Sequence, residues 1–236
     1  MDKIQEREEF LQKFFGDGNK IAFEQLKQFN ELMVRYNCAV REIRTKFEVL
    51  NEELSFHTSR NPIESISSRI KSPVSIVNKL ARLGKDLSVE AIEENLNDVA
   101  GIRVICSFID DIYKVADMLA KQDDITVIQI KDYIQKPKLN GYRSYHMIVE
   151  VPVFFSESKQ ITRVEIQLRT VAMDFWASLE HQMKYKKSTA DRPEISAELK
   201  SCAEVIAATD ARMQGIRKRI EMLENECSEQ KNGGVL

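Results

Sequence analysis

Asp98 and Glu165 are the two acids whose surroundings point to metal-assisted chemistry. Asp98 comes directly before a predicted strand at 101–108, and Glu165 lies inside another predicted strand at 161–169. Mg²⁺ takes one or two protein carboxylates and completes its shell with water and phosphate oxygens. Taken alone, Asp98 also fits an ordinary turn residue, and the sequence does not bring the two acids together. The pair is therefore a candidate magnesium site that depends on how the strands are arranged.

The strand that contains Glu165 has one polar face. Because side chains alternate along a strand, its apolar face is formed by Val164, Ile166 and Leu168. Its polar face consists of Arg163, Glu165, Gln167 and Arg169. A second predicted strand at 142–155 should place Tyr142, Ser144 and His146 on one face. A solvated sheet surface is the common alternative, but two polar faces of matching character favour a floor on which a substrate lies.

A basic helix is predicted from Ser72-Pro73, a capping serine followed by a first-turn proline, to Gly84. On this helix Ser75, Lys79 and Arg82 recur at spacings of four and three, so they share one face. The segment 65–85 has five basic residues and no acid. A basic face beside a hydroxyl suits a triphosphate. A solvated basic face is the alternative, which the lack of acids disfavours.

A basic, turn-rich loop at 131–144 leads into the second polar strand. Lys136, Lys138 and Arg143 could hold phosphates, and Tyr142 offers a flat surface for stacking a base. Basic loops are common, so this pattern alone does not separate a nucleotide site from an ordinary surface loop.

The remaining pattern predicts the elements that must position these residues. Further strands are expected at 101–108 and 125–133, and helices at 111–121 and 171–187. Asn61-Pro62, with Glu64 as a capping-box acid, predicts another helix start. Strands with a crossover helix between helical ends indicate an α/β or α+β fold with a mixed sheet in one domain.

Both ends of the chain are predicted to be helical. Apolar residues recur in steps of four and three over 22–54 and again over 199–227, as in long helices that bury one narrow face. These seams could pack on their own domain or could also form an oligomer interface, and the sequence does not choose between the two. A shorter helix is expected before Gly16-Asp17-Gly18, and disorder after about Ser228.

Composition excludes several classes of protein. The chain has 236 residues, a net charge of −2 and no apolar run long enough to span a bilayer, and its first residues do not resemble a signal peptide. A cytoplasmic protein without wholesale nucleic-acid binding is expected. The four cysteines lack metal-ligand spacing, and the three histidines form no HExxH motif, so a zinc hydrolase is disfavoured.

Four ordered motifs resemble those of the RelA/SpoT synthetase domain. They occupy 97–103 (NDVAGIR), 140–146 (NGYRSYH), 164–170 (VEIQLRT) and 175–181 (FWASLEH). The resemblance covers roughly 60–187 and is greatest to the RelP-like branch of stand-alone small alarmone synthetases. It implies a nucleotidyltransferase-like mixed sheet flanked by helices. The implied organisation is a helical extension at 1–60, a synthetase core at 61–190, a long helix at 191–228 and a disordered tail at 229–236.

The same resemblance implies a role for each candidate residue. It assigns Asp98 and Glu165 to Mg²⁺ and places His146 close to the reacting groups. The implied ATP-binding residues are Arg69 and Arg103 on the two faces of adenine, with Lys71, Ser75, Lys79 and Arg82 at the phosphates. Tyr142 would stack on guanine, and the remaining GDP- or GTP-binding residues would be Lys136, Lys138, Asn140, Arg143, Ser144, Gln167 and Arg169.

The implied reaction moves pyrophosphate from ATP to the 3′-hydroxyl of GDP or GTP, giving AMP, in the bacterial stringent response. Synthesis without hydrolysis is expected, because the chain has no room for the hydrolase and regulatory domains of long family members. The resemblance also implies a homotetramer, which small synthetases commonly form and with which the terminal seams are compatible. A nucleotidyltransferase acting on RNA or another acceptor is the alternative. Such an enzyme should show a Gly-Ser motif before two acids one residue apart, and the sequence has no such arrangement. A non-catalytic module with a dead pocket is harder to reconcile with both Asp98 and Glu165.

Overall fold

A mixed sheet forms the centre of the protein. The computed structural model describes residues 20–57, 60–184 and 193–232. The elements in chain order are α2 (Lys20–His57), β1 (Ile63–Ile70), α3 (Pro73–Arg82), α4 (Val89–Asn95), β2 (Ala100–Cys106), α5 (Ile109–Ala120), β3 (Thr126–Asp132), β4 (Tyr145–Phe154), β5 (Lys159–Thr170), α6 (Val171–Lys184) and α7 (Pro193–Asn232). The five strands are ordered β1-β2-β5-β4-β3, and β2 and β5 are parallel while the other neighbours are antiparallel. The predicted mixed α/β fold is confirmed.

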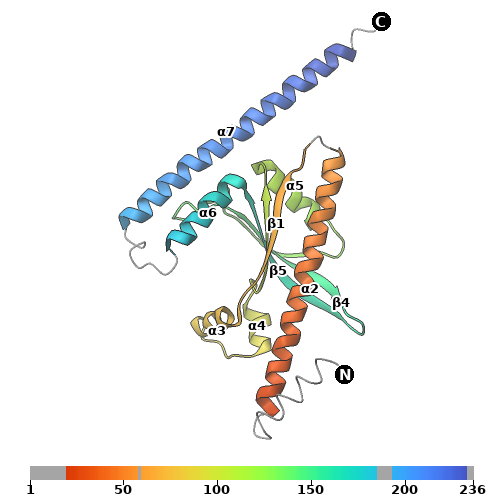
Figure 1. Cartoon of the computed structure of the whole chain (residues 1–236), viewed down its shortest axis with the longest axis vertical. Helices are drawn as coiled ribbons and strands as arrows, with labels where there is room; N and C mark the ends of the chain where they lie inside the picture. The colour runs from red at the N-terminus through yellow and green to blue at the C-terminus, as the bar shows by residue number, and fades with distance from the viewer. Residues whose placement is uncertain (1–19, 58–59, 185–192, 233–236) are drawn as a thin grey trace.

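The apolar face of the sheet is covered by α2 and α5. Figure 1 shows α2 running along one side of the strands, with α3 and α6 on the other side. The seam of α2 is buried against this face, including Tyr36, Ile43, Phe47 and Leu50. The facing strand residues Val104, Ile166, Leu168 and Met147 are also buried. The seam of the N-terminal helix therefore packs on its own domain.

The prediction that a helix begins at Asn61-Pro62 is wrong, because this segment leads directly into β1. Ile63 pairs with Cys106 and Ile70 with Ala100 in an antiparallel ladder. Glu64 does not cap a helix; its carboxylate accepts a hydrogen bond of 2.6 Å from the Ser107 hydroxyl. Proline before the first strand residue removes no ladder donor. The local cap pattern was thus outweighed by pairing with a strand about forty residues away.

The helix predicted at Ser72-Pro73 is confirmed as α3. The Ser72 hydroxyl accepts a hydrogen bond of 3.3 Å from the Ser75 amide, and the helix ends one residue before Leu83. Gly84 follows with a φ of 65°, a conformation that glycine adopts without strain. The short helix α4, capped by Ser88, was not predicted.

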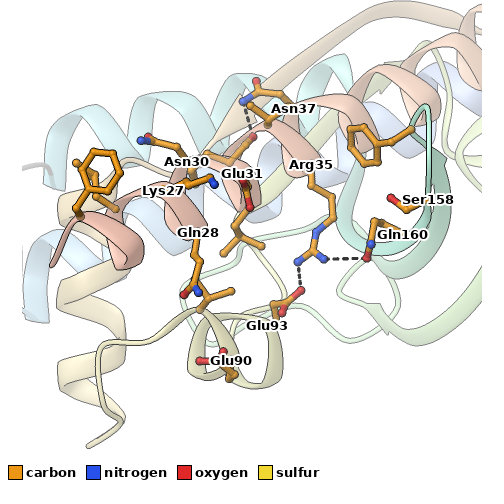
Figure 2. A pocket seen from close by; sticks show the side chains of 17 residues that line it. Lys27, Gln28, Asn30, Glu31, Arg35, Asn37, Glu90, Glu93, Ser158 and Gln160 are labelled. Carbon is orange, nitrogen blue, oxygen red and sulfur yellow. Dashed lines mark hydrogen bonds and ion pairs between the residues drawn. The ribbon is translucent and has the colours of Figure 1, made fainter. Parts of the chain in front are cut away.

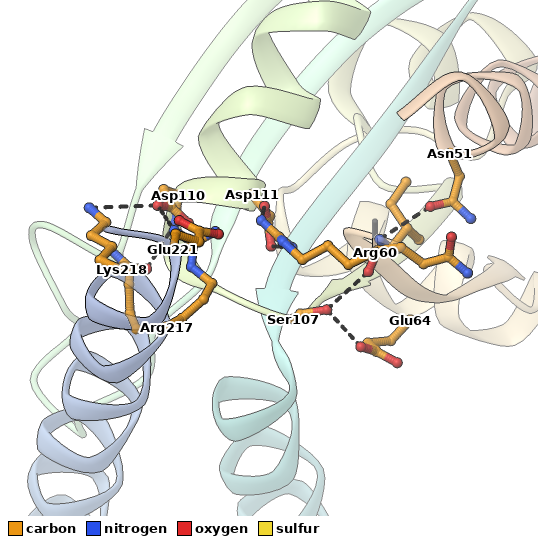
Figure 3. A network of polar contacts seen from close by, with 12 residues as sticks. Asn51, Arg60, Glu64, Ser107, Asp110, Asp111, Arg217, Lys218 and Glu221 are labelled. Carbon is orange, nitrogen blue, oxygen red and sulfur yellow. Dashed lines mark hydrogen bonds and ion pairs between the residues drawn. The ribbon is translucent and has the colours of Figure 1, made fainter. Parts of the chain in front are cut away.

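Helix α7 is attached to α6, to α5 and to the end of β5, where the Thr170 hydroxyl donates a hydrogen bond of 2.6 Å to Asp210. Near its start, Trp176 of α6 donates a hydrogen bond of 3.0 Å to the Leu199 carbonyl, inside a small apolar cluster with Ala177 and Ala203. Further along, Arg217 pairs with Asp110 at the start of α5 (Figure 3). The helix thus holds α6 and α5 together across the outside of the sheet.

The contact with α5 is a network of alternating charges. Arg60 makes two hydrogen bonds of 2.7 Å to the buried carboxylate of Asp111 (Figure 3). The Phe108 ring lies beneath two guanidinium groups, with Arg60 Cζ 5.4 Å and Arg217 Cζ 4.8 Å from its centroid. Cation–π contacts of this kind add to the ion pairs.

The ends of the chain depart from the prediction in part. Helix α7 continues to Asn232, beyond the predicted start of disorder at 229, because Glu, Gln and Lys continue a helix well until Gly233. Residues 233–236 and the helix predicted before Gly16 lie outside the described residues. Among the described residues, none of the helices is long and apolar enough to cross a membrane.

Two glycines with positive φ give a test of the packing of α7. A Cβ on Gly84 would meet no heavy atom within 4 Å, whereas a Cβ on Gly141, whose φ is 87°, would lie 2.5 Å from the Ala203 Cβ. Both Ala substitutions impose a left-handed backbone on a non-glycine residue, at about 1–2 kcal/mol. We expect Gly141→Ala to cost a further ~1–3 kcal/mol from overpacking.

Urea unfolding of the two variants and the unsubstituted protein measures this difference. Gly84→Ala is the matched control, since it shares the backbone strain without the clash. Equal losses of unfolding free energy in the two variants would contradict the packing of the 138–144 loop on α7.

Candidate active site

The strand register gathers the predicted residues on the polar face of the sheet. Gly101 lies opposite both Arg69 of β1 and Glu165 of β5, and Gln167 lies between Arg103 of β2 and His146 of β4. Residues that pair across strands share a face, as do residues two apart on one strand. One face, opposite the core, therefore carries Arg69, Arg103, Glu165, Gln167, Arg169 and His146.

Asp98 lies at one edge of this face, between two lysines. Its Oδ1 is 2.7 Å from Lys79 Nζ on α3, and its Oδ2 is 3.0 Å from Lys71 Nζ. Lys71 is held in place by its own amide, which donates to the Val99 carbonyl at 2.8 Å. Burial acts to raise the pKa of Asp98, but the two lysines outweigh it and the pKa is lowered. Asp98 is therefore an anion within a basic cradle.

Glu165 has a hydrogen-bond donor at one carboxylate oxygen and an imidazole nitrogen facing the other. Gln167 Nε2 donates to Oε2 at 3.0 Å, and His146 Nδ1 lies 3.6 Å from Oε1. Burial acts to raise the pKa of Glu165, and the charge of Asp98 adds to that, but His146 and Gln167 outweigh both and the pKa is lowered. The charge of Asp98 thus acts on Glu165 from beyond hydrogen-bond contact. The two carboxylates are the oxygen donors that could hold Mg²⁺.

A closed ring of polar contacts surrounds Glu165. The Tyr142 hydroxyl lies 2.8 Å from His146 Nε2 and accepts a hydrogen bond of 2.8 Å from Arg169 Nη2. The same Nη2 donates to Gln167 Oε1 at 3.0 Å, and Gln167 leads back to Glu165. Every member of the ring was predicted as a site residue, but their mutual contacts were not.

Two arginines lie side by side at the β1–β2 edge of the face. Burial lowers the pKa of Arg103, and the charges of Arg169 and Arg69 act in the same direction. Arg103 Nη1 is 3.4 Å from Asp174 Oδ1 on α6, which holds it over the sheet. Paired planar guanidinium groups suit the two faces of a planar base. On α3, Ser75 is partly buried with its hydroxyl 2.8 Å from that of Ser72, while Arg82 is exposed.

The 133–144 loop brings cations to Tyr142. Lys138 Nζ is 4.8 Å from the ring centroid of Tyr142, and Arg169 Cζ is 5.2 Å from it. Asn140 holds the loop, since its Oδ1 accepts from the Tyr142 amide at 3.2 Å and its Nδ2 donates to Glu180 at 3.2 Å. Lys136 is exposed on the same loop.

Two predicted site residues lie away from this face. Ser144 is 0% exposed and donates to the Leu168 carbonyl at 3.2 Å, so it fixes the backbone between β4 and β5. Arg143 lies beside Asp210 of α7, in a small hollow that Met173 also lines. The expected sharing of one face by Tyr142, Ser144 and His146 is wrong for Ser144. Because β4 begins at Tyr145, strand alternation does not apply to the residues before it.

A hollow away from this face is a separate feature of the described residues. It has a volume of about 1070 Å³ and lies between the first half of α2, α4 and the turn joining β4 to β5 (Figure 2). Neither Asp98 nor Glu165 lines it. Arg35 crosses its wall, paired with Glu93 and donating to Gln160 at 3.3 Å (Figure 2).

Comparison with known proteins agrees with this arrangement. Residues 68–190 match the model of the region found in RelA/SpoT proteins. The chain belongs to the RelA/SpoT family. It is 44% identical over 205 residues to the GTP pyrophosphokinase YwaC of Bacillus subtilis, covering 87% of this chain and 96% of the relative.

Solved structures of small alarmone synthetases share the fold. Small alarmone synthetase 2 from Bacillus subtilis matches with a TM-score of 0.72 and 46% identity, covering 80% of this chain and 97% of that one. Small alarmone synthetase 1 from the same organism, bound to its product pppGpp, matches with a TM-score of 0.75 and 36% identity, covering 82% and 98%.

Sequence reasoning missed one important residue of this RelA/SpoT site. Asp174 of α6 accepts a hydrogen bond of 2.9 Å from Arg169 Nη1 and also pairs with Arg103. It therefore fixes two arginines that lie on neighbouring strands. The available signal was an acid in the first turn of the helix that directly follows the polar strand, close in sequence to Arg169.

The lowered pKa of Asp98 predicts how stability depends on pH. A carboxylate with a folded pKa below its unfolded value of about 3.8 stabilises the protein above that value. This contribution is lost as the pH falls through the folded pKa. We expect Asp98→Asn to be less stable near neutral pH, with a difference from the unsubstituted protein that shrinks below about pH 4. Urea unfolding at a series of pH values checks this, and a pH-independent difference would contradict it.

Proposed function

We propose that this protein is a (p)ppGpp synthetase that transfers pyrophosphate from ATP to the 3′-hydroxyl of GDP or GTP. The observation that carries the proposal is the pairing of Asp98 with two lysines, beside a sheet face on which Glu165 lies and feels the charge of Asp98. The Bacillus relatives support it, since one is named a GTP pyrophosphokinase and another is bound to pppGpp as its product. RNA nucleotidyl transfer, the alternative, is not favoured by these relatives.

The reaction requires an oxygen nucleophile in line with the bond that breaks. The 3′-oxygen of the acceptor forms a bond to the β-phosphorus of ATP, and the bond from that phosphorus to the α-phosphate oxygen breaks. AMP leaves with the bridging oxygen, and the proton of the hydroxyl is released. The protein must therefore align two nucleotides and neutralise charge on phosphate oxygens.

The residues at the Asp98 edge fit the donor triphosphate. Lys71 and Lys79 are strong donors to phosphate oxygens, and they are already gathered at one place by Asp98. Arg69 and Arg103 would enclose the adenine. Asp98 and Glu165 fit the oxygen ligands of Mg²⁺, which when bound would stabilise negative charge on the phosphates.

The residues around Glu165 fit the acceptor nucleotide. Glu165 has a lowered pKa, so it is ionised near neutral pH and can orient the 3′-hydroxyl or take its proton. Tyr142 would stack on guanine beside Lys138. Asn140, Lys136 and Gln167 complete this side, whereas the positions of Ser144 and Arg143 favour a supporting role.

We expect Glu165→Gln to retain nucleotide binding but to lower turnover by roughly 100-fold or more, because the amide cannot accept the proton or hold the metal as strongly. Glu157→Gln, at an exposed position in the β4–β5 turn, is the matched control. The assay incubates the protein with ATP, GDP or GTP, and Mg²⁺, and separates the products by chromatography.

AMP and a 3′-pyrophosphorylated guanosine nucleotide should form together, and EDTA should stop the reaction. Formation of ADP, or release of pyrophosphate alone, would contradict the proposed transfer. Incubation with the purified product tests the further part of the proposal, that the protein synthesises without hydrolysing.

The exposed part of α7 supports assembly into a homo-oligomer, which we take to be a tetramer acting in the cytoplasm, where its nucleotide substrates are. Leu199 and Ala203 of the seam are buried against α6, but Met213, Ile220 and Leu223 are exposed. Phe175 and Leu179 of α6 are also exposed. We call these exposed apolar residues of α7 and α6 the apolar stripe, and exposed apolar patches of this kind often mark contact surfaces.

Light scattering should give a mass close to four chains of 27.3 kDa. The double variant Met213→Glu, Ile220→Glu should dissociate, because it places charges in the apolar stripe. Val49→Glu, at an exposed apolar position on α2, serves as the control and should leave the mass unchanged. A monomeric mass for the unsubstituted protein would contradict the assembly.

A further inference from the structure

Arg169 is enclosed by the protein, although the family resemblance assigned it to nucleotide binding. Its residue exposure is 5%, and its two terminal nitrogens donate to Tyr142, Gln167 and Asp174. A guanidinium that is buried and already donates three hydrogen bonds to protein groups is not placed to grip a phosphate. Arg169 therefore acts on the groups to which it donates hydrogen bonds.

An arginine only donates, so Arg169 makes acceptors of the Tyr142 oxygen and of Gln167 Oε1. The Tyr142 oxygen accepts from Nη2, and we assign its hydroxyl proton to the other neighbour, His146 Nε2 at 2.8 Å. Nε2 then accepts, and a neutral imidazole must carry its proton on Nδ1. Nδ1 is the atom that faces Glu165 Oε1, 3.6 Å away.

The second arm of the ring is ordered in the same way. Arg169 Nη2 donates to Gln167, which identifies the acceptor as the amide oxygen Oε1. The amide nitrogen therefore points to Glu165 Oε2, at 3.0 Å. One guanidinium nitrogen thus directs two chains, and each chain ends with an N–H aimed at a different oxygen of the same carboxylate.

We propose that Arg169 is a positioning residue that orients Glu165 through both arms, and that the Tyr142 hydroxyl relays its effect by fixing the Nδ1–H form of His146. This inference rests on the proposed function for its role in turnover. The proposal gives the two parts of the Tyr142 side chain different roles. The ring stacks on the acceptor base, and the hydroxyl helps to orient the Glu165 carboxylate through His146. Removing the hydroxyl alone should therefore lower kcat without weakening acceptor binding.

The tautomer can be measured in the nucleotide-free protein. The chain has three histidines, so histidine-selective ¹³C and ¹⁵N labelling with a His146→Gln spectrum identifies the His146 signals. The measurement is made at about pH 8, above the ordinary histidine range. We expect the proton on Nδ1 in the unsubstituted protein and a shift toward Nε2 in Tyr142→Phe. A proton on Nε2, or on both nitrogens, in the unsubstituted protein would overturn the proposal.

The kinetic experiment uses the same variant, Tyr142→Phe. Tyr142→Phe should lower kcat about tenfold, the scale of one hydrogen bond, and leave KM for GDP or GTP within about twofold. Tyr113→Phe is the matched control, because it removes a hydroxyl with a hydrogen bond of 2.9 Å, to Asp132, outside the site. It should change neither kcat nor the His146 tautomer. Unchanged kcat in Tyr142→Phe would overturn the relay.

Arg169→Lys tests whether the Arg169 guanidinium orders both hydrogen-bond chains, through Tyr142 and through Gln167. Lysine keeps the positive charge but lacks the planar fork of donors. We expect loss of the Nδ1–H preference together with a fall in kcat, and urea unfolding confirms that the variant is folded. A lysine variant that retains both would overturn the role of Arg169. If the protein makes no alarmone yet shows the expected tautomer shifts, the proposed function fails while the ordering of the ring is supported.

Discussion

The parallel pairing of β2 with β5 is the constraint on which the site depends. It places Gly101 opposite Glu165, and β1 adds Arg69 on the other side of the same glycine. A Cβ at Gly101 would lie 3.5 Å from the Arg69 carbonyl oxygen, so three backbones come close here. Because side chains alternate along a strand, a shift of one residue would turn Glu165 into the apolar core. The core formed by α2 and α5 on the opposite face makes that shift costly.

Two acids in this site are kept ionised by different means. Asp98 is compensated by two lysine cations, whose flexible four-carbon stems would let them turn to the phosphates of an arriving nucleotide. Glu165 is compensated by Gln167 and His146, which belong to a closed ring and have no such freedom. The first arrangement suits exchange of partners on substrate binding. The second suits a carboxylate whose direction has to stay fixed while the partners of Asp98 change.

The elements that were predicted correctly are those whose signals lie within the element itself. Helix α3 has its own cap, and β2 and β5 are rich in β-branched and apolar residues that favour strands. The prediction failed where a distant partner decides the outcome. Asn61-Pro62 has the pattern of a helix start, but the chain pairs with β2 instead. Strand alternation was applied to Ser144, which lies before the strand begins and points into the protein.

The individual site residues were easier to predict than their relations. Residue types and motifs indicated Tyr142, His146, Gln167 and Arg169, but hydrogen-bond direction depends on which atoms face each other across two strands and a loop. The loop itself rests on α7, since Gly141 lies against Ala203 and Lys200. Helix α7 also carries the exposed apolar stripe, beyond the buried positions Leu199 and Ala203. The surface that we assign to assembly and the support of the Tyr142 loop therefore belong to one rigid helix, so a change in the position of α7 reaches the acceptor side of the site directly.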